Sequence, residues 1–595
     1  MANLSPIAYE ILPADPAAHL FEVTLTVEKP EPGMRFTLPA WIPGSYMIRE
    51  FARNIVHIAA EIDGTEVPLV KCDKHSWVLG EVAKGAKKLR LVYRVYAWDL
   101  SVRCAHLDDS HGFFNGTQVF LRVEGRETTK HRVRILPPAG VRDWTVATSM
   151  RTSSGTGAAK LRGFGWYEAG DYDELIDHPV EMGRLTWGSF KVRGVPHDFA
   201  INGRHDCDME RLTRDLVEVC EQQCAVFGDA APPFDRYVFM TTVVGDGYGG
   251  LEHRASTALL ASRNDLPFKG MKASTEDYRG FLGLCSHEYF HSWNVKRIKP
   301  AAFVPYDLQE ENYTRLLWLF EGFTSYYDDL ALVRAGVISE AEYFDLLAKT
   351  LSAVRRGGGR HVQSVAESSF DAWIKYYRQD ENAPNAIVSY YAKGSLVALA
   401  LDLHLRAKSK GARSLDDVMR LLWSRFGETG VGVPEDSVPA IVKEATGVDA
   451  RKLLIEATEG VEDLPLEKLV KALGMELGWK PENEQPVIGA KFGSEGESVK
   501  LVNVMNGGPA HQAGLSAGDL VIAVDGLRVK AGGLDKVLTR RAAGERLRLH
   551  AFRRDELFET EIVLAASAAT AATLSPDKRA GAEALRLKKA WLERA

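Results

Sequence analysis

Two histidines and a glutamate near the middle of the sequence have the spacing of a zinc site. His287, Glu288 and His291 form the pattern H-E-x-x-H. Residues four apart share one face of a helix, so both imidazoles can bind one Zn²⁺, while Glu288 can act as general base on a water activated by the metal. The flanking residues are apolar nearly all round, which predicts a buried helix. Burying these polar groups is costly unless a metal offsets the cost, so the pattern predicts one zinc ion per chain.

A catalytic zinc also needs a third protein ligand and one open coordination position. Glu321 lies in LWLFEGFTSYY, among large apolar residues where a carboxylate is badly placed unless it coordinates something. Glu310 and Glu311 are closer to the histidines along the chain, but they lie in polar YDLQEENY, where solvated charges are the ordinary interpretation. We therefore predict Glu321 as the third ligand, with Glu310 or Glu311 as the alternatives.

The segment around Glu321 resembles a helix of known enzymes. LWLFEGFTSYY is similar to the helix by which the aminopeptidase N-type gluzincins provide their glutamate ligand. The spacing differs, because Glu321 follows His291 by 30 residues, further than in those enzymes. The additional residues then form a longer connection between the two helices.

A glycine-rich segment upstream resembles a second motif of the same enzymes. GGLEH (249–253) is similar to their glycine-x-methionine-glutamate motif, with Leu251 in place of methionine. By that resemblance, Gly249 and Gly250 let a peptide backbone run along a strand edge. Glu252 then binds the free α-amino group of the substrate, as a carboxylate paired with an ammonium. A glycine turn followed by an exposed glutamate is the alternative.

A tyrosine segment downstream resembles a third motif. SYYAKG (389–394) is similar to the tyrosine-x-lysine-glycine segment that opens a helix in these enzymes. Carried over by position, Tyr391 is the phenol that donates a hydrogen bond to the developing oxyanion. Tyr390 is the competing choice, and simple packing is an alternative for either tyrosine.

The elements that position these residues fall into a β-rich part and a mainly helical part. From residue 1 to 190 apolar and polar residues alternate with period two, which predicts a β-sandwich-like domain that contains the aromatic turn WIPGSY (41–46). From 191 to 478 a helix (208–228), a strand (236–245) and several long helices predict a mixed α+β catalytic domain.

The carboxyl-terminal part has turns and short strands again. WKPENEQP (479–486) is typical of a linker, and the segment 479–565 resembles a PDZ domain of the bacterial protease type, with VIGAKF (487–492) where such domains bind a peptide carboxylate. Peptide binding there is possible, and a structural or autoinhibitory role is an equal alternative. The tail 566–595 is alanine-rich and predicts a terminal helix with Ser575 as N-cap and Pro576 at its first position.

The composition excludes several function classes. The 595 residues include 74 basic and 80 acidic ones, and the formal charge of −6 has the wrong sign for a dedicated nucleic-acid binder. No stretch approaches the length of a membrane-spanning helix, and six cysteines are too sparse for a disulfide framework. The opening segment has no features of a signal peptide, so a cytoplasmic enzyme is expected. The oligomeric state is not predicted.

Together these features resemble one family, the glycyl aminopeptidases, which are PDZ-containing gluzincins. The resemblance covers nearly the whole chain. It implies a multidomain α+β fold with an all-β amino-terminal domain, a thermolysin-like, mainly helical catalytic domain and a carboxyl-terminal PDZ domain. It also implies a zinc aminopeptidase that releases glycine, and alanine to a lesser degree, from peptides with a free amino terminus. Nothing in the spacing or composition shows that preference.

Two other functions stay open at this point. One is a zinc endopeptidase in which the PDZ domain presents protein substrates. The other is a non-catalytic binding protein in which only the PDZ domain works. Comparing a free peptide with its amino-acetylated form separates the first from an aminopeptidase, and a zinc assay separates the second.

Overall fold

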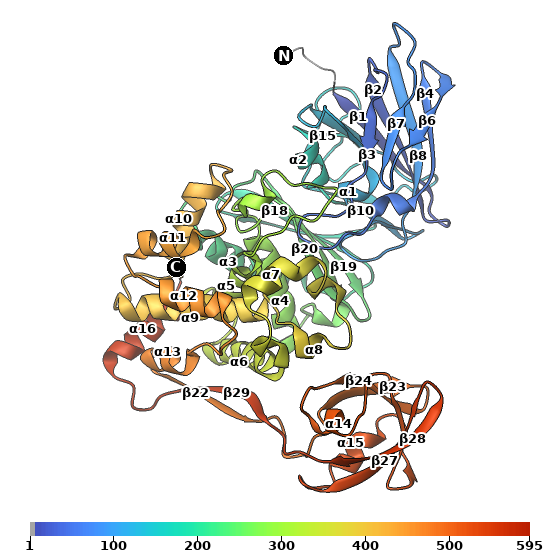
Figure 1. Cartoon of the computed structure of the whole chain (residues 1–595). Coiled ribbons are helices and arrows are strands. Elements are labelled where there is room, and N and C mark those ends of the chain that lie inside the picture. Colours follow the sequence, from blue (N-terminus) through green and yellow to red (C-terminus); the bar gives the residue numbers. More distant parts are fainter. Residues whose placement is uncertain (1–5, 595) are drawn as a thin grey trace.

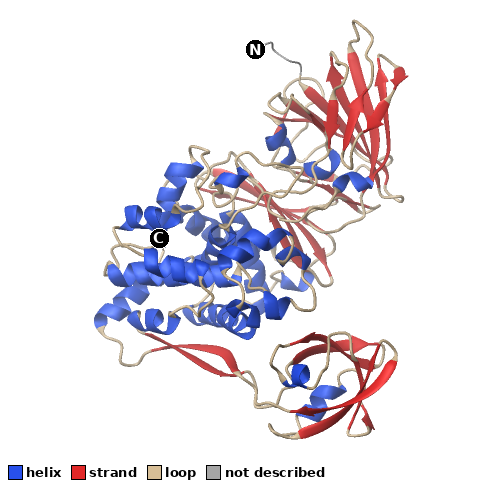
Figure 2. Ribbon diagram, in the orientation of Figure 1, coloured by secondary structure: helices blue, strands red, loops and turns tan. Residues whose placement is uncertain are grey.

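The computed structural model describes residues 6–594 and shows three bodies in chain order (Figure 1). A β-rich domain is followed by a mainly helical region. A two-stranded ribbon connects this region to a small separate domain (Figure 2). The first five residues of the opening segment, where no signal peptide is expected, lie outside the described residues, as does residue 595. The predicted multidomain α+β fold is confirmed.

The amino-terminal domain contains three sheets, in which most neighbouring strands are antiparallel. The largest has the order β14-β15-β12-β1-β2-β8-β4-β5. Inward residues alternate with outward ones along β1, β2 and β8, which is the period-two pattern of the sequence. The strands of this sheet are β1 (Ile7–Asp15), β2 (Leu20–Glu28), β4 (Ile55–Ile62), β5 (Thr65–Val67), β8 (Lys88–Tyr96), β12 (His131–Ile135), β14 (Arg151–Thr152) and β15 (Gly165–Ala169).

Two smaller four-stranded sheets complete this domain. Their orders are β13-β16-β10-β9 and β11-β3-β7-β6. The strands are β3 (Arg35–Thr37), β6 (Leu69–Lys71), β7 (Ser76–Leu79), β9 (His106–Leu107), β10 (His111–Phe114), β11 (Arg122–Val123), β13 (Thr145–Ala147) and β16 (Val180–Gly183). Short helices α1 (Gly116–Val119) and α2 (Tyr172–Ile176) lie between strands.

The catalytic region combines one mixed sheet with a group of helices. The sheet has the order β17-β18-β19-β21-β20, in which β20 is an edge strand paired only with β21 among the described residues. Its strands are β17 (Thr186–Val192), β18 (Val195–Asn202), β19 (Tyr237–Val244), β20 (Tyr248–Glu252) and β21 (Ser256–Ser262). The predicted boundary at residue 190 falls inside β17, so this region begins a few residues earlier than predicted.

Helices α4 and α5 carry the motif residues, and α9 packs against α5. The two helices α5 and α9 approach so closely that a Cβ at Gly322 would lie 2.6 Å from the backbone of Gly394, so both positions require glycine. The helices of the region are α3 (Met209–Val226), α4 (Glu276–Phe290), α5 (Leu317–Arg334), α6 (Glu340–Arg356), α7 (Val365–Phe370), α8 (Ala383–Ala386), α9 (Ala392–Lys408), α10 (Leu415–Leu422), α11 (Val438–Thr446), α12 (Arg451–Glu459) and α13 (Leu466–Ala472).

A ribbon of two antiparallel strands, β22 (Met475–Pro481) and β29 (Ala569–Pro576), leads to the PDZ domain and back (Figure 1). The predicted linker therefore begins inside a strand. The predicted start of the terminal helix is wrong: Ser575 and Pro576 pair with β22, and the helix α16 runs over Ala582–Leu592. The partner strand β22 supplies the backbone hydrogen bonds that extend this segment.

The PDZ domain has a hydrophobic core of its own, whereas the amino-terminal domain and the catalytic region share one. Its elements are β23 (Ala490–Glu495), β24 (Ser498–Val504), α14 (Pro509–Gln512), β25 (Leu520–Val524), β26 (Leu527–Arg528), α15 (Gly533–Leu538), β27 (Arg546–Arg553) and β28 (Glu556–Val563). None of the helices within residues 6–594 is both long and apolar enough to cross a membrane.

Candidate active site

Helix α4 brings the two motif histidines onto one face. Thr275 caps its start by accepting a hydrogen bond from the backbone N–H of Tyr278. The helix ends at Phe290, but His291 at the C-cap keeps a helical backbone (φ −60°, ψ −18°). The ring atoms Nε2 of His287 and His291 therefore lie 3.0 Å apart.

Glu321 of α5 completes a compact set of three donor atoms. Its Oε2 lies 3.2 Å from His291 Nε2 and 3.8 Å from His287 Nε2. The three donors lie within 4.8 Å of one another. Two imidazoles and one carboxylate that leave a side open fit a catalytic zinc ion. Glu310 is exposed, and neither it nor Glu311 belongs to a donor group among the described residues.

Each of the three donor residues also makes a hydrogen bond through a side-chain atom that does not belong to the donor set. His287 Nδ1 lies 3.0 Å from Asp328 Oδ2, and His291 Nδ1 lies 2.8 Å from the carbonyl oxygen of Asn294. Tyr46 donates a 3.0 Å hydrogen bond to the second oxygen of Glu321. These partners leave the Nε2 atoms and one carboxylate oxygen free for the metal, as the outer contacts of metal ligands commonly do.

These hydrogen-bond partners were not predicted from the sequence. Asp328 carried a signal, because it follows Glu321 by seven residues and so lies two turns further on the same helical face. No sequence signal indicated that Tyr46 contacts a metal ligand, because the turn WIPGSY belongs to another domain and meets Glu321 only in the folded structure.

Glu288 is buried beside the donor set and against the edge strand β20. Its Oε2 has no hydrogen-bond partner. A Cβ at Gly250 would lie 2.0 Å from Glu288 Oε1, so only glycine admits the carboxylate here. Burial raises the pKa of Glu288, which the charges of His287 and His291 oppose. Gly249 precedes Gly250 on the same edge strand.

Glu252 ends β20 and is only 4% exposed. Its Oε1 has no hydrogen-bond partner. The turn WIPGSY packs onto it, because a Cβ at Gly44 (φ +102°) would lie 2.5 Å from Glu252 Oε1. Burial raises the pKa of Glu252 to about 7; the charge of His291 opposes this rise, and that of Glu321 adds to it. A buried carboxylate without a partner among the described residues can pair with a cationic group.

Tyr391 lies at the N-cap of α9 with its ring facing His287. The two ring centroids are 6.3 Å apart at an interplanar angle of 29°. Its hydroxyl lies 3.2 Å from the hydroxyl of Tyr377. Burial, together with the charge of Glu321, raises the pKa of Tyr391 and keeps the phenol protonated. Tyr390 is fully buried, and its hydroxyl lacks a hydrogen-bond partner.

Arg103 is a further cation that the sequence analysis did not single out. It comes from the amino-terminal domain and donates a 3.5 Å hydrogen bond to the carbonyl oxygen of Gly250. Its charge also acts on Glu288. The site is thus assembled from the helices α4 and α5, the start of α9, an edge strand and two segments of the amino-terminal domain.

Comparisons with known proteins agree with this construction. Family models match the chain at residues 8–184 (Peptidase M61 N-terminal domain), 280–397 (M61 glycyl aminopeptidase) and 486–564 (PDZ domain). A crystal structure of an aminopeptidase N family protein from Idiomarina loihiensis is 42% identical, with a TM-score of 0.93, over 98% of this chain and 100% of that one.

An M1 zinc metallopeptidase from Deinococcus radiodurans is 16% identical, with a TM-score of 0.49, over 78% of this chain and 96% of that one. The search of curated proteins gives no match. On the family models and the 42% identity across the full chain, the protein belongs to the M61 glycyl aminopeptidase family and is a zinc metallopeptidase of aminopeptidase type.

Proposed function

We propose that the enzyme removes amino-terminal glycine, and alanine more slowly, from peptides with a free amino group. His287, His291 and Glu321 hold one catalytic zinc ion. A zinc ion held there would supply Lewis acidity for the scissile carbonyl and for a water molecule near neutral pH. Glu288 accepts a proton from this water and then delivers it to the leaving amine.

Tyr391 donates its hydroxyl proton as a hydrogen bond to the carbonyl oxygen while negative charge develops there. The support for this role is its ring over His287 and its raised pKa, which keeps the donor protonated. Tyr377 positions the hydroxyl through the 3.2 Å contact. Tyr390 is the less suitable donor, because it is fully buried, whereas Tyr391 is partly exposed and stacks on His287.

Glu252 binds the α-ammonium group of the substrate, and Gly249 and Gly250 let the peptide follow the edge of β20. The observation that carries this proposal is the buried Oε1 of Glu252, which has no partner and lies beside the donor set. An endopeptidase would gain nothing from this carboxylate. In a longer substrate, the nitrogen that would lie beside Glu252 belongs to a neutral amide and carries no positive charge.

The preference for glycine rests on the family and on crowding near Glu252. Tyr46 donates a hydrogen bond to Glu321, and Gly44 of the same turn packs against Glu252, so this aromatic turn lies beside both carboxylates. Trp373 and Tyr377 pack on Tyr46 with ring centroids 5.8 and 6.0 Å away. We infer from this aromatic packing that the enzyme favours substrates with a small first side chain.

Binding of a peptide carboxyl terminus by the PDZ domain remains a prediction. In the loop 487–490, the carbonyl oxygens of Ile488 and Gly489 accept hydrogen bonds from the backbone N–H groups of Ala510 and Met505 of the same domain. The cytoplasmic location is likewise a prediction from the sequence.

Hydrolysis of amino-acid p-nitroanilides, with and without chelator, tests the proposal. We expect rates in the order glycine, alanine, leucine, no cleavage of acetyl-glycine p-nitroanilide, and recovery after zinc is returned. Cleavage of blocked and free substrates at equal rates would support the endopeptidase. Glu252→Gln should lower kcat/KM for free-amine substrates by about 100-fold, which corresponds to about 3 kcal/mol for a buried ion pair. Glu310→Gln, at an exposed position, is the matched control.

A further inference from the structure

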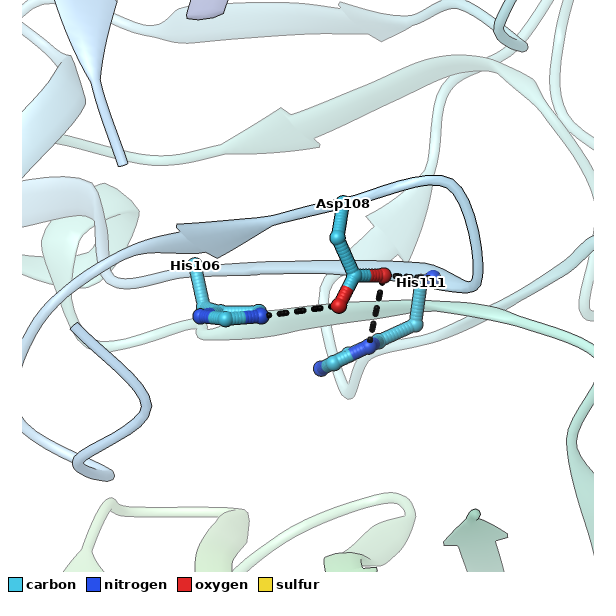
Figure 3. A group of neighbouring side chains, drawn as sticks. All are labelled: His106, Asp108 and His111. Carbon is cyan, nitrogen blue, oxygen red and sulfur yellow. Dashed lines mark hydrogen bonds and ion pairs between the residues drawn. The ribbon is translucent and has the colours of Figure 1, made fainter. Parts of the chain in front are cut away.

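A second set of two histidines and one carboxylate lies in the amino-terminal domain. His106, Asp108 and His111 belong to the hairpin of β9 and β10, and their donor atoms lie within 4.8 Å of one another. His106 Nε2 is 3.2 Å from Asp108 Oδ2, and His111 Nδ1 is 3.4 Å from Asp108 Oδ1. Both imidazoles turn a ring nitrogen toward the carboxylate (Figure 3).

These separations suit a shared metal ion. Donors about 2.1 Å from a tetrahedral zinc are about 3.4 Å apart. The donors of the catalytic set span the same range, from 3.0 to 3.8 Å. The two sets therefore have the same donor chemistry, and in each the donor atoms lie within 4.8 Å of one another.

The turn of the hairpin does not by itself require a carboxylate at residue 108. Oδ1 of Asp108 caps the turn by accepting hydrogen bonds from the backbone N–H of Ser110 (2.7 Å) and of His111 (3.0 Å). An asparagine oxygen would serve equally. Oδ2 accepts from no backbone N–H among the described residues and faces His106 instead.

Burial of the imidazoles adds a second observation. His106 and His111 are each 5% exposed, and Nε2 of His111 has no hydrogen-bond partner within residues 6–594. Glu181, also buried, has a free Oε1. His106, His111 and Glu181 line one cavity of about 10 Å³ against β19, which is close to the space of one water molecule. A water there can join His111 to Glu181, as a carboxylate behind a metal-bound histidine does.

We propose that His106, Asp108 and His111 bind a second divalent transition metal, Zn²⁺ in this chain, with water in the open position. Imidazole and carboxylate donors favour this class of ion. The predicted count of one zinc per chain becomes two. The proposal does not depend on the catalytic roles given above.

The metal would secure the base of the loop that carries Arg103. That loop, residues 99–105, is closed by a bridge between Trp98 and His106 and by the hydrogen bond from Asp99 N–H to the carbonyl of Ala105. Arg103 reaches the carbonyl of Gly250 beside Glu288. By fixing the hairpin, the metal holds Arg103 in the active site. This second metal ion therefore has a structural role.

Zinc content of the full chain tests the proposal. After dialysis against micromolar free Zn²⁺, elemental analysis should find two zinc ions in the wild type and one in Asp108→Asn, which keeps the cap. Asp109→Asn, at the exposed neighbouring position, should keep two. One zinc in the wild type, or two in Asp108→Asn, overturns the proposal.

A spectroscopic measurement isolates the hairpin from the catalytic set. In His291→Ala, Co²⁺ titration should quench the fluorescence of Trp98, whose ring stacks on His106 with centroids 4.7 Å apart. The quench should disappear when Asp108→Asn is added to that variant. A quench of equal size in both variants contradicts metal binding at the hairpin.

Discussion

The catalytic set and the hairpin set use the same donors, two imidazoles and one carboxylate, but their surroundings differ. At the catalytic set, both outer ring nitrogens are hydrogen-bonded, by Asp328 and by the carbonyl of Asn294. At the hairpin, Nδ1 of His106 has no partner. Donors identify a metal, whereas the contacts behind them set how tightly it is held.

The two sets also differ in the groups beside the metal. Glu288 and Glu252 lie next to the catalytic set with carboxylate oxygens that have no hydrogen-bond partner. Beside the hairpin, Glu181 is the buried acid, and it lies behind His111 in a cavity of about 10 Å³. General acid–base chemistry needs carboxylates beside the metal; two of them flank the catalytic set and one flanks the hairpin set.

The largest expected effect separates the two metals. Glu321→Ala removes a ligand of the catalytic zinc, so hydrolysis should fall to the level of the chelated enzyme while the hairpin keeps its ion. Elemental analysis should then find one zinc per chain. Glu310→Ala is the matched control and should keep both ions and full activity; loss of zinc and activity in that variant would instead assign the ligand to Glu310.

A smaller loss of activity is expected when only the proton carrier changes. Glu288→Gln keeps the shape that packs on Gly250, so both zinc ions should stay. General acid–base catalysis contributes about 10²- to 10⁴-fold, and kcat should fall by that amount. Steady-state kinetics on the glycine substrate and elemental analysis give the two values. Retained activity in the zinc-loaded variant would show that another group is the base.

Removing one outer contact should make the catalytic set resemble the hairpin. Asp328→Asn weakens the hydrogen bond to His287 Nδ1, and such contacts are worth about 10- to 100-fold in metal affinity. Competition with a chromogenic chelator measures this affinity. Asp329→Asn is the neighbouring control. Equal affinity in Asp328→Asn and the wild type would mean that the outer contact does not set the difference between the two sites.

The smallest expected effect is the order in which the wild type loses its ions. The hairpin zinc, with fewer outer contacts, should leave at about tenfold less chelator than the catalytic zinc. Zinc content and activity followed together in one titration should therefore show about half of the metal lost before most of the activity. Activity that falls with the first ion removed would reverse the predicted order.

Much of the fold and of the site followed from local patterns. Period-two alternation indicated the strands of the amino-terminal domain, and the resemblance indicated the fold class, the family and the enzyme class, which are confirmed. The tail shows where local signals failed. Ser575 and Pro576 are typical of a helix start, but pairing with β22 and a hydrogen bond from Ala572 to Ser352 hold this segment extended.

The sequence by itself determined the catalytic donors His287 and His291, because the H-E-x-x-H spacing places them on one face of α4 and its C-cap. The hairpin set was not predicted from the sequence. Only the tertiary structure decided what surrounds them. Tyr46 contacts Glu321 across 275 residues of sequence, Arg103 contacts Gly250 across 147, and Gly44 covers Glu252. Spacing within one element follows from backbone geometry, whereas contacts between domains depend on how the shared core packs.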